Sequence, residues 1–442
     1  MMVFQLILKI LKKNNLFFAI KGKKIDGHNF SKEAIKKGAI KLVISKKLKH
    51  IDKNKYIKVK NTLSSLNNLA KITRDYSPAT IVGITGSVGK TTLKNLISFS
   101  LENYGKTYHS PHSYNNKFGV PLSVSNLKRD TNYGVFEIGM DKKGEINNLS
   151  KIVRPEIGII TNISGAHFKN FNTLKDIAKA KSEIINNILE KGNIILNKDD
   201  KFFNFLSSIA KKNDKNVISF SAKKSADIFL QSIKKIKKKY RLKIIVNKKI
   251  FYFYVKYCVD SFINNILACI SVLFILNLDL KKMENGFINF LIPTGRGDIS
   301  IVNKFKKKFK FIDESYNANP LSMSSAIKNM SIYKRKNNSK KLVLLSDMLE
   351  LGKQSIKLHK KLSIVINRSD IDKVFVYGKH IKETFNYLSK NKKGKVFNNL
   401  KEAYDHFSKI LHNNDLLMIK GSNATGLNQF SKNIKKRQIS AI

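Results

Sequence analysis

Cysteine is scarce in this chain of 442 residues. Only Cys258 and Cys269 occur, and their spacing fits neither a CxxC motif nor a set of metal ligands. This excludes a disulfide scaffold and a cysteine-based zinc site, and it suits a reducing compartment. The chain also lacks the roughly 18 consecutive apolar residues that a membrane-spanning helix needs. The apolar opening is short and is interrupted by Lys9, so we expect no signal peptide, no membrane span and a cytoplasmic location.

Acidic residues are also few. The chain has 31 Asp and Glu against 84 Lys and Arg, which gives a formal net charge of +53. Such a charge can serve binding to nucleic acid or to an anionic membrane surface. The lysines are scattered through every segment, however, and no aromatic and basic platform is concentrated anywhere. We interpret the charge mainly as a compositional bias and predict no specific nucleic-acid partner, with a nucleic-acid-binding ATPase as a distant alternative.

The length and the order of elements indicate an α/β protein of three domains. Strand-like apolar runs alternate with helical patterns, which is typical of parallel sheets, and 442 residues exceed one hydrophobic core. We predict a small N-terminal α/β substrate domain at 1–78 and a central P-loop ATPase-type parallel-sheet domain at 79–297. A Rossmann-like C-terminal domain is predicted at 298–442.

Individual elements can be placed within these domains. We expect a strand at Thr80–Thr85, a buried helix near Ser261–Leu276, and hairpins on a domain face between about residues 228 and 255. The tail after Lys432 is basic and polar, and we expect it to fray. Further strands are expected at 133–138, 156–162, 309–312, 341–345, 373–377 and 415–419.

The segment Gly83–Thr92 reads as a phosphate loop between a strand and a helix. Its glycines let backbone N–H groups converge on phosphate, and the helix N-terminus adds a favourable partial charge. Ile84 occupies the first glycine position of the general phosphate-loop pattern, so the spacing is irregular. The loop predicts ATP binding, with phosphate or metal contacts from Gly86, Ser87, Gly89, Lys90, Thr91 and Thr92.

The motifs along the rest of the chain narrow the reaction class. The sequence contains, in order, Asp26-Gly27-His28-x-Phe30, Asn115-Asn116-x-x-Gly119-Val120-Pro121, Glu137–Met140, Ala166-His167 and Ala178–Ile184. Together with the phosphate loop they resemble the Mur ligase family, which builds the peptide of the bacterial cell wall. Two later motifs, Asp313–Pro320 and Asp347–Gly352, are similar to those of the members that join D-alanyl-D-alanine to UDP-N-acetylmuramoyl-tripeptide.

The resemblance implies an ATP-dependent ligase with these two substrates as its partners, acting as a monomer. The tripeptide carboxylate takes the γ-phosphoryl group of ATP, and the dipeptide amine displaces phosphate from the acyl phosphate. This step brings anions together, so it needs cations more than a protein nucleophile. Another amide ligase of the same superfamily, adding one amino acid or adding glutamates to folate, is the nearer alternative.

The resemblance also assigns residues. Thr91 and Glu137 match the ligands of one Mg²⁺, and His167 and Lys181 match those of a second, with Lys181 as a carbamate. Composition alone would make Lys181 one solvated lysine among many. The implied catalytic set is Lys90, His167, Lys181 and Arg296, and the implied nucleotide contacts further include Asn116, Asn265, Arg296 and Asp313.

Two of these assignments have ordinary alternatives, and some family motifs are altered. Asn116 also suits a turn before Gly119, and Arg296 also suits a hinge ion pair. The family's Thr-Asp-Ser-Arg-like uridine motif is absent before Leu16, so the first domain is expected to be shortened at its start. The adenine motif reads Ser261–Ile266, and Lys420–Asn423 ends in asparagine in place of arginine.

Overall fold

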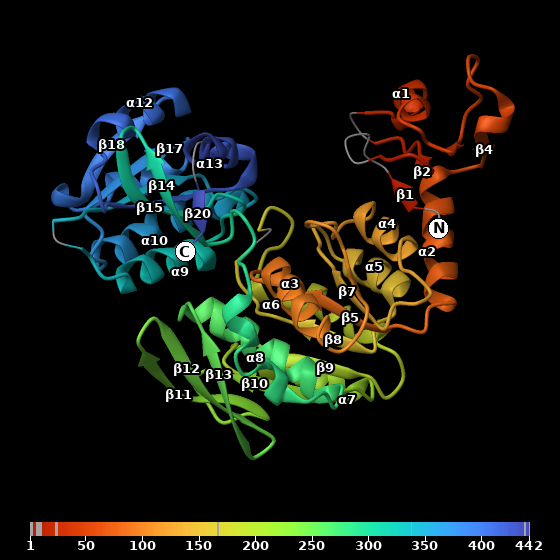
Figure 1. Cartoon of the computed structure of the whole chain (residues 1–442), viewed down its shortest axis with the longest axis horizontal. Helices are drawn as coiled ribbons and strands as arrows, with labels where there is room; N and C mark the ends of the chain where they lie inside the picture. The colour runs from red at the N-terminus through yellow and green to blue at the C-terminus, as the bar shows by residue number, and fades with distance from the viewer. Residues whose placement is uncertain are drawn as a thin grey trace.

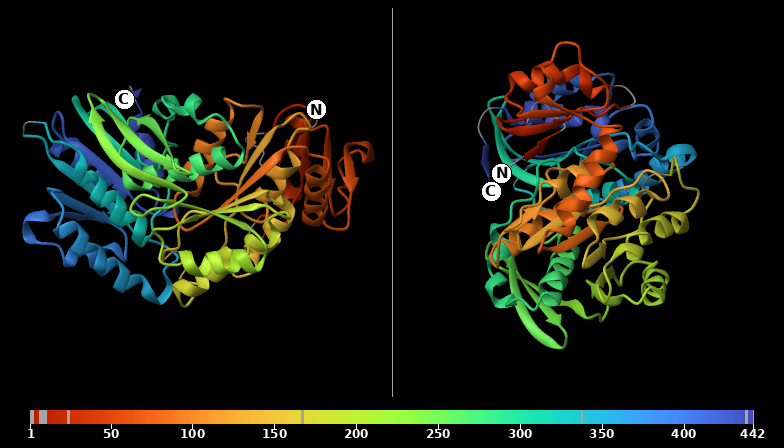
Figure 2. Two further views of the ribbon diagram at one scale, coloured as in Figure 1. Left: turned by 90° about the horizontal axis from the view of Figure 1, so that it is seen from below. Right: turned by 90° about the vertical axis from the view of Figure 1, so that its right-hand side faces the viewer.

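The computed structural model describes residues 3–5, 11–22, 25–165, 168–336, 338–436 and 439–441. These form three lobes, each with its own sheet: red at the N-terminus, orange to green in the centre and blue at the C-terminus (Figure 1). The N- and C-terminal lobes flank the central one (Figure 2). The α/β class is as predicted. The limits drawn after residues 78 and 297 fall between sheets and stay predictions as domain boundaries.

The N-terminal sheet has four parallel strands in chain order. Helix α1 (Ser31–Lys36) lies within this lobe, and α2 (Thr62–Asp75) leads out of it and packs on α4 (Gly119–Ser125) of the central lobe. Leu66 and Leu122 bury their side chains in one apolar cluster with residues of β2 and β3. The strands are β1 (Val3–Gln5), β2 (Asn15–Phe18), β3 (Lys41–Ile44) and β4 (Tyr56–Lys58).

The central sheet has the order β13-β12-β11-β10-β9-β8-β5-β7-β6. Strands β5 to β11 run parallel. Strands β11, β12 and β13 form the expected hairpins, which extend the sheet at one edge. Strand β5 pairs with β7 on one side and with β8 on the other, so chain order reverses there. A ligand site is expected at the carboxyl end of such a switch point. The strands are β5 (Thr80–Thr85), β6 (Thr107–His109), β7 (Tyr133–Glu137), β8 (Ile157–Ile160), β9 (Asn193–Asn197), β10 (Asn216–Ser221), β11 (Ile228–Ile236), β12 (Lys239–Val246) and β13 (Lys249–Val255).

Helices cover both faces of this sheet. On one face α3 (Lys90–Leu101) packs against α8 (Asp260–Ile275), whose apolar residues are buried almost all round, as predicted for this stretch. The other face is covered by α4, α5 (Glu145–Val153), α6 (Leu174–Ser182) and α7 (Phe203–Lys212). No helix in the described ranges is long and apolar enough to cross a membrane.

The C-terminal sheet has the order β18-β17-β16-β19-β15-β14-β20, with β14 and β20 antiparallel to their neighbours. Its helices are α9 (Pro320–Ile332), α10 (Ser355–Asn367), α11 (Ile381–Asn386), α12 (Leu400–Ile410) and α13 (Leu427–Lys435). Its strands are β14 (Asp298–Lys304), β15 (Lys307–Glu314), β16 (Lys341–Ser346), β17 (Lys373–Tyr377), β18 (Lys393–Phe397), β19 (Leu416–Lys420) and β20 (Ile439–Ala441).

The expectation of a frayed tail is wrong. Helix α13 continues to Lys435, whose ammonium group lies 2.6 Å from a carboxylate oxygen of Asp298 and 2.9 Å from one of Asp313. Beyond it, β20 pairs with residues 300–302 of β14. Long-range ion pairs and sheet pairing therefore hold a segment that its local composition marks as mobile.

Candidate functional site

The phosphate loop leaves β5 and enters α3 through two glycines in conformations that side chains rarely adopt. Gly86 has φ +143°, and Gly89, the N-cap of α3, has φ +88°. A Cβ atom at Gly86 would lie 1.9 Å from Oγ1 of Thr161. The loop can therefore approach the end of β8 only because residue 86 is glycine.

Residues after β8 fix the loop in place. The backbone N–H of Ser87 donates to the Asn162 carbonyl at 3.0 Å, and that of Val88 donates to Oδ1 of Asn162 at 3.1 Å. Thr161 Oγ1 donates to the Val88 carbonyl at 2.7 Å. The first-turn N–H groups of α3 have no intrahelical acceptor and remain available to an anion.

Lys90 opens α3 with its ammonium group folded back over the loop. Its Nζ donates to the Gly86 carbonyl at 2.8 Å. Burial lowers the pKa of Lys90, while the nearby Glu137 carboxylate raises it and Arg296 lowers it further. An incoming phosphate would therefore meet a partly desolvated cation.

Thr91 and Glu137 form the oxygen-rich side of the site. Thr91 Oγ1 donates to Oε2 of Glu137 at 2.6 Å, and Asn115 Nδ2 donates to Oε1 at 2.7 Å. Glu137 ends β7 and is 2% exposed. A hydroxyl and a carboxylate suit Mg²⁺, which takes one or two carboxylates together with water and phosphate oxygens. The described ranges contain no cluster of three or more His, Cys, Asp or Glu residues that could hold a metal ion.

Lys181 lies near the end of α6 and is 1% exposed. Burial, reinforced by the positive charge of Lys90, holds the pKa of Lys181 well below its usual range. Within the described part of the chain, no residue forms a hydrogen bond or an ion pair with its ammonium group. The interpretation of Lys181 as a solvated surface lysine is therefore wrong. His167, its predicted partner at the second metal, lies outside the described residues.

Arg296 and Asn265 approach the phosphate loop from other elements. Arg296 lies between Gly295 and Gly297, which have φ +78° and +98°, in the turn between the central and C-terminal sheets. Its Nη2 donates to Ser113 Oγ at 2.9 Å, and its guanidinium lies 4.2 Å from the centre of the Tyr316 ring. Asn265 on α8 is 7% exposed, and its side chain reaches Gly89. No carboxylate within the described ranges pairs with Arg296.

The phosphate loop, Glu137, Asn265 and Arg296 line one cavity of about 890 Å³ between the central and C-terminal lobes, whereas Lys181 is not on its wall. This volume suits a nucleotide together with part of a second substrate. The C-terminal wall adds an ion pair that the sequence did not indicate, with Lys420 Nζ 2.9 Å from Oε2 of Glu314. Central residues on the wall include Ser87, Gly89, Lys90, Thr91, Thr92, Ser113, Asn115, Glu137 and Asn265, and C-terminal ones include Glu314, Tyr316, Asn317, Asn319 and Lys420.

Two predicted nucleotide contacts make other interactions in this structure. Oδ1 of Asn116 accepts hydrogen bonds from the N–H groups of Phe118 and Gly119, both at 3.0 Å, at the start of α4. Asp313 is 1% exposed and accepts hydrogen bonds from Ser315 at one oxygen and from Lys435 at the other. Neither residue lines the cavity, so their nucleotide roles remain predictions.

Sequence reasoning missed the residues that support the site from behind. Lys94 is fully buried, and its ammonium group donates to the carbonyls of Ser110 and His112. Burial lowers the pKa of Lys94 to about 8, opposed by Glu137 and reinforced by Arg296. The sequence did carry one signal for Lys94: it lies four residues after Lys90, which places both on the same face of the helix.

Comparison with protein families identifies three matching segments. The Mur ligase middle domain matches residues 84–273, and the Mur ligase glutamate ligase domain matches residues 299–423. The Mur ligase family catalytic domain matches residues 10–74. The three matches follow the order of the three sheets.

Curated relatives and solved structures agree with these matches. A relative from Rickettsia prowazekii (strain Madrid E) is 31% identical over 95% of this chain and 92% of its own. One from Buchnera aphidicola subsp. Baizongia pistaciae (strain Bp) is 34% identical over 91% and 85%. Both are named UDP-N-acetylmuramoyl-tripeptide–D-alanyl-D-alanine ligase.

The solved structures show the same fold. A MurF crystal structure from Acinetobacter baumannii has a TM-score of 0.84 at 24% identity, covering 98% of this chain and 93% of that one. The MurF ligase of Thermotoga maritima in complex with ADP has a TM-score of 0.81 at 24% identity, covering 99% and 98%.

Proposed function

The chain belongs to the Mur ligase family, and we propose that it joins D-alanyl-D-alanine to UDP-N-acetylmuramoyl-tripeptide at the expense of ATP, in peptidoglycan precursor synthesis. One observation carries the proposal. In a chain 31% and 34% identical to ligases of that name, the cavity between two lobes is lined by a phosphate loop, the buried Thr91–Glu137 pair and Arg296.

The cations around the loop serve phosphoryl transfer between two anions. Lys90 and the first-turn N–H groups of α3 bind the terminal phosphates, and Arg296 presents its guanidinium from the cavity wall. A positioned guanidinium and ammonium stabilise the charge that develops as the tripeptide carboxylate attacks the γ-phosphate. Asn265 on α8 contributes to the nucleotide pocket beside Gly89.

Thr91 and Glu137 would hold one Mg²⁺, since their oxygens are buried, adjacent and at the mouth of the loop. The bound ion would neutralise phosphate charge. In this structure the Thr91 hydroxyl and the Asn115 amide each donate to one oxygen of the Glu137 carboxylate. This arrangement sets the carboxylate orientation before the ion arrives.

Lys181 and His167 would serve a second Mg²⁺. A cationic lysine cannot bind a metal cation, so Lys181 must lose its proton and gain an anionic group. Burial and Lys90 lower the pKa of Lys181, which favours the neutral amine that reacts with carbon dioxide to form a carbamate. The carbamate would also supply the negative charge that the Lys181 surroundings lack.

The C-terminal wall would receive the incoming dipeptide. Glu314 and Lys420 present one carboxylate and one ammonium group to the cavity, together with the Tyr316 ring. The N-terminal lobe would bind the UDP-sugar end of the tripeptide substrate. We further propose that the chain works as a monomer in the cytoplasm.

Product analysis tests this function. The purified chain, ATP, Mg²⁺ and both substrates should yield UDP-N-acetylmuramoyl-pentapeptide, detected by mass spectrometry, with one ADP per product. Omitting ATP or replacing D-alanyl-D-alanine with L-alanyl-L-alanine should abolish the product. ATP hydrolysis without a pentapeptide, or an equal yield with the L,L-dipeptide, would contradict the proposal.

A further inference from the structure

The hydroxyl group of Ser113 lies where three parts of the site meet. Ser113 belongs to the connection between β6 and α4. Its Oγ lies 3.2 Å from Thr91 Oγ1 of the phosphate loop and accepts a hydrogen bond from Arg296 Nη2 at 2.9 Å. One small side chain therefore joins the metal side of the site to the turn that leads into the C-terminal lobe.

The directions of these hydrogen bonds follow from the chemistry of the groups. A guanidinium can only donate, so Ser113 Oγ must accept from Arg296. The Thr91 hydroxyl gives its proton to Glu137 at 2.6 Å, which leaves its lone pairs to accept the Ser113 proton. The chain runs in one direction from Arg296 through Ser113 and Thr91 to Glu137. Such a chain, charged at both ends, strengthens each of its bonds.

The backbone before Ser113 is held firmly. Lys94, buried under the loop, donates to the carbonyls of Ser110 and His112. His112 has φ +45°, an unfavourable conformation that persists because these contacts maintain it. Ser110 Oγ also accepts the Glu137 N–H at 3.3 Å. The Ser113 hydroxyl is thus placed by the same framework that places Glu137.

The bond to Ser113 leaves Arg296 able to bind phosphate. Arginine carries five N–H donors, and within the described part of the chain Ser113 accepts the one side-chain hydrogen bond that Arg296 makes. Tyr316 covers one face of the guanidinium, and Arg296 lines the cavity. Ser113 therefore orients the guanidinium without competing for the donors that face a nucleotide.

We propose that Ser113 is a positioning residue that holds Arg296 beside Thr91 and Glu137 before the nucleotide binds. Ser113 thereby sets the distance between Arg296, which would bind the terminal phosphate, and the Thr91–Glu137 pair, which would bind the metal. The role rests on the proposed function, because it requires MgATP to bind at this loop. Its signature is energetic coupling between Ser113 and Arg296.

A double-mutant cycle measures that coupling without turnover. Binding of a non-hydrolysable ATP analogue with Mg²⁺ would be measured by calorimetry for the wild type, Ser113→Ala, Arg296→Ala and the double variant. Ser113→Ala should weaken binding about tenfold, the size of one charge-assisted hydrogen bond. In the Arg296→Ala background the same change should cost less than about twofold. Ser113→Thr, which keeps the hydroxyl, should retain wild-type affinity within about threefold.

Controls separate positioning from general damage. Ser113→Cys keeps the volume with a weak acceptor, and it should behave like Ser113→Ala even if the alanine variant folds poorly. The control serine is Ser125, which is more buried than Ser113 and donates to the Pro121 carbonyl within α4. Ser125→Ala should leave affinity unchanged, both alone and in the Arg296→Ala background. If the affinity losses of Ser113→Ala and Arg296→Ala are additive, the positioning role of Ser113 is wrong, while the proposed function stands. Absence of analogue binding by the wild type would instead contradict the proposed function.

Discussion

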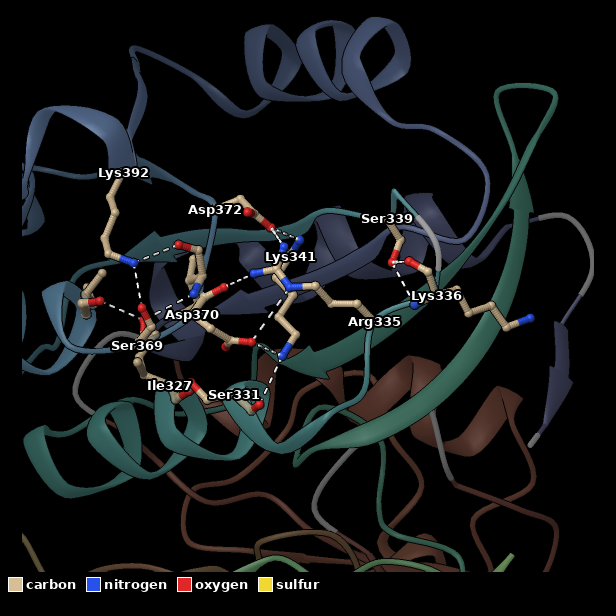
Figure 3. Close-up of polar contacts among 12 residues, drawn as sticks. Ile327, Ser331, Arg335, Lys336, Ser339, Lys341, Ser369, Asp370, Asp372 and Lys392 are labelled. Carbon is tan, nitrogen blue, oxygen red and sulfur yellow. Dashed lines mark hydrogen bonds and ion pairs between the residues drawn. The ribbon is translucent and has the colours of Figure 1, made fainter.

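The chain contains two clusters of cations that each include buried lysines, and they differ in what balances the charge of those lysines. At the phosphate loop, Lys90 lies within electrostatic reach of the Glu137 carboxylate and of Arg296, and its charge also acts on the buried Lys181. At the opposite end of the C-terminal sheet's strands, Arg335, Lys341 and Lys392 meet two carboxylates and several carbonyl groups (Figure 3). Lys181 has no anionic partner in the described part of the chain, whereas Lys341 in the second cluster pairs with Asp370.

The C-terminal cluster holds the loop at residues 369–372, before β17, in place. Lys341 Nζ lies 2.6 Å from Asp370 and donates to the Ser331 carbonyl at 3.0 Å, and Arg335 pairs with Asp372 at 2.6 Å. Lys392 donates to the carbonyls of residues 369 and 371 at 2.6 and 2.9 Å. Partial burial alone would raise the pKa of Asp370, but its hydrogen bond from Lys341 and nearby cations lower it. This cluster fastens the loop before β17 to the end of α9 and to β16.

The difference shows how a functional lysine can be told from a structural one. A buried charge is costly unless an opposite charge or hydrogen bonds compensate it. Lys341 is compensated within the fold, whereas Lys181 has no such partner in the described part of the chain. A buried cation without such a partner favours an anionic ligand or the loss of its proton. Both clusters contain a buried lysine, and the absence of an anionic partner distinguishes Lys181 from Lys341.

The largest effect is expected at the loop itself. Lys90→Ala should reduce ligation by about a thousandfold, because it removes a desolvated cation from the phosphate site. Steady-state kinetics measures the loss. The matched control is Lys392→Ala, which deletes a buried lysine of the other cluster and should leave kcat within about twofold. Similar turnover losses in both variants would erase the distinction between the clusters.

Lys181→Ala should show the next largest effect. We expect activity to fall about a hundredfold, because the variant cannot form the proposed carbamate ligand. Acetate should partly restore turnover by supplying a carboxylate in the vacated space, whereas chloride at equal ionic strength should not. An active variant without acetate would show that Lys181 is not a metal-side group.

Lys341→Ala should lower the stability of the protein and leave its turnover unchanged. Removing this ammonium group leaves the Ser331 carbonyl without its buried donor and Asp370 without its closest partner, at a cost of about 2 kcal/mol. Urea unfolding measures the free-energy change. At a temperature where the variant stays folded, its kcat and its KM for ATP should match the wild type. A lowered kcat with normal stability would assign this cluster a role in catalysis.

An effect that appears only at alkaline pH is expected from Lys94. Its pKa is about 8 in the folded protein against 10.5 ordinarily, so between these values the native chain has lost a proton that the unfolded chain retains. Wild-type stability should then rise relative to Lys94→Met between pH 8 and 10.5, by at most about 1.4 kcal/mol per pH unit, and stay level below pH 8. Urea unfolding over this range measures the difference, and a fall would contradict it.

Local patterns predicted much of this molecule, and long-range contacts account for what they missed. The phosphate loop, the buried helix α8 and most parallel strands were predictable because glycine spacing and apolar runs are local signals. The choice between Asn115 and Asn116 was not, because adjacent residues point in different directions and only the fold shows which one meets Glu137. Ser113 had no local signal, since both of its partners are distant in sequence or belong to another element.

Heavy-oxygen transfer tests the central claim most directly. The tripeptide substrate would carry heavy oxygen in the carboxylate that is joined to the dipeptide, and the phosphate released from ATP would be analysed by mass spectrometry. If the site transfers the γ-phosphoryl group to that carboxylate, one carboxylate oxygen leaves with the phosphate. Each phosphate released with product should then contain one heavy oxygen from a fully labelled substrate. Released phosphate without heavy oxygen, its fourth oxygen coming from water, would show that ATP is hydrolysed without forming an acyl phosphate, and would contradict the account.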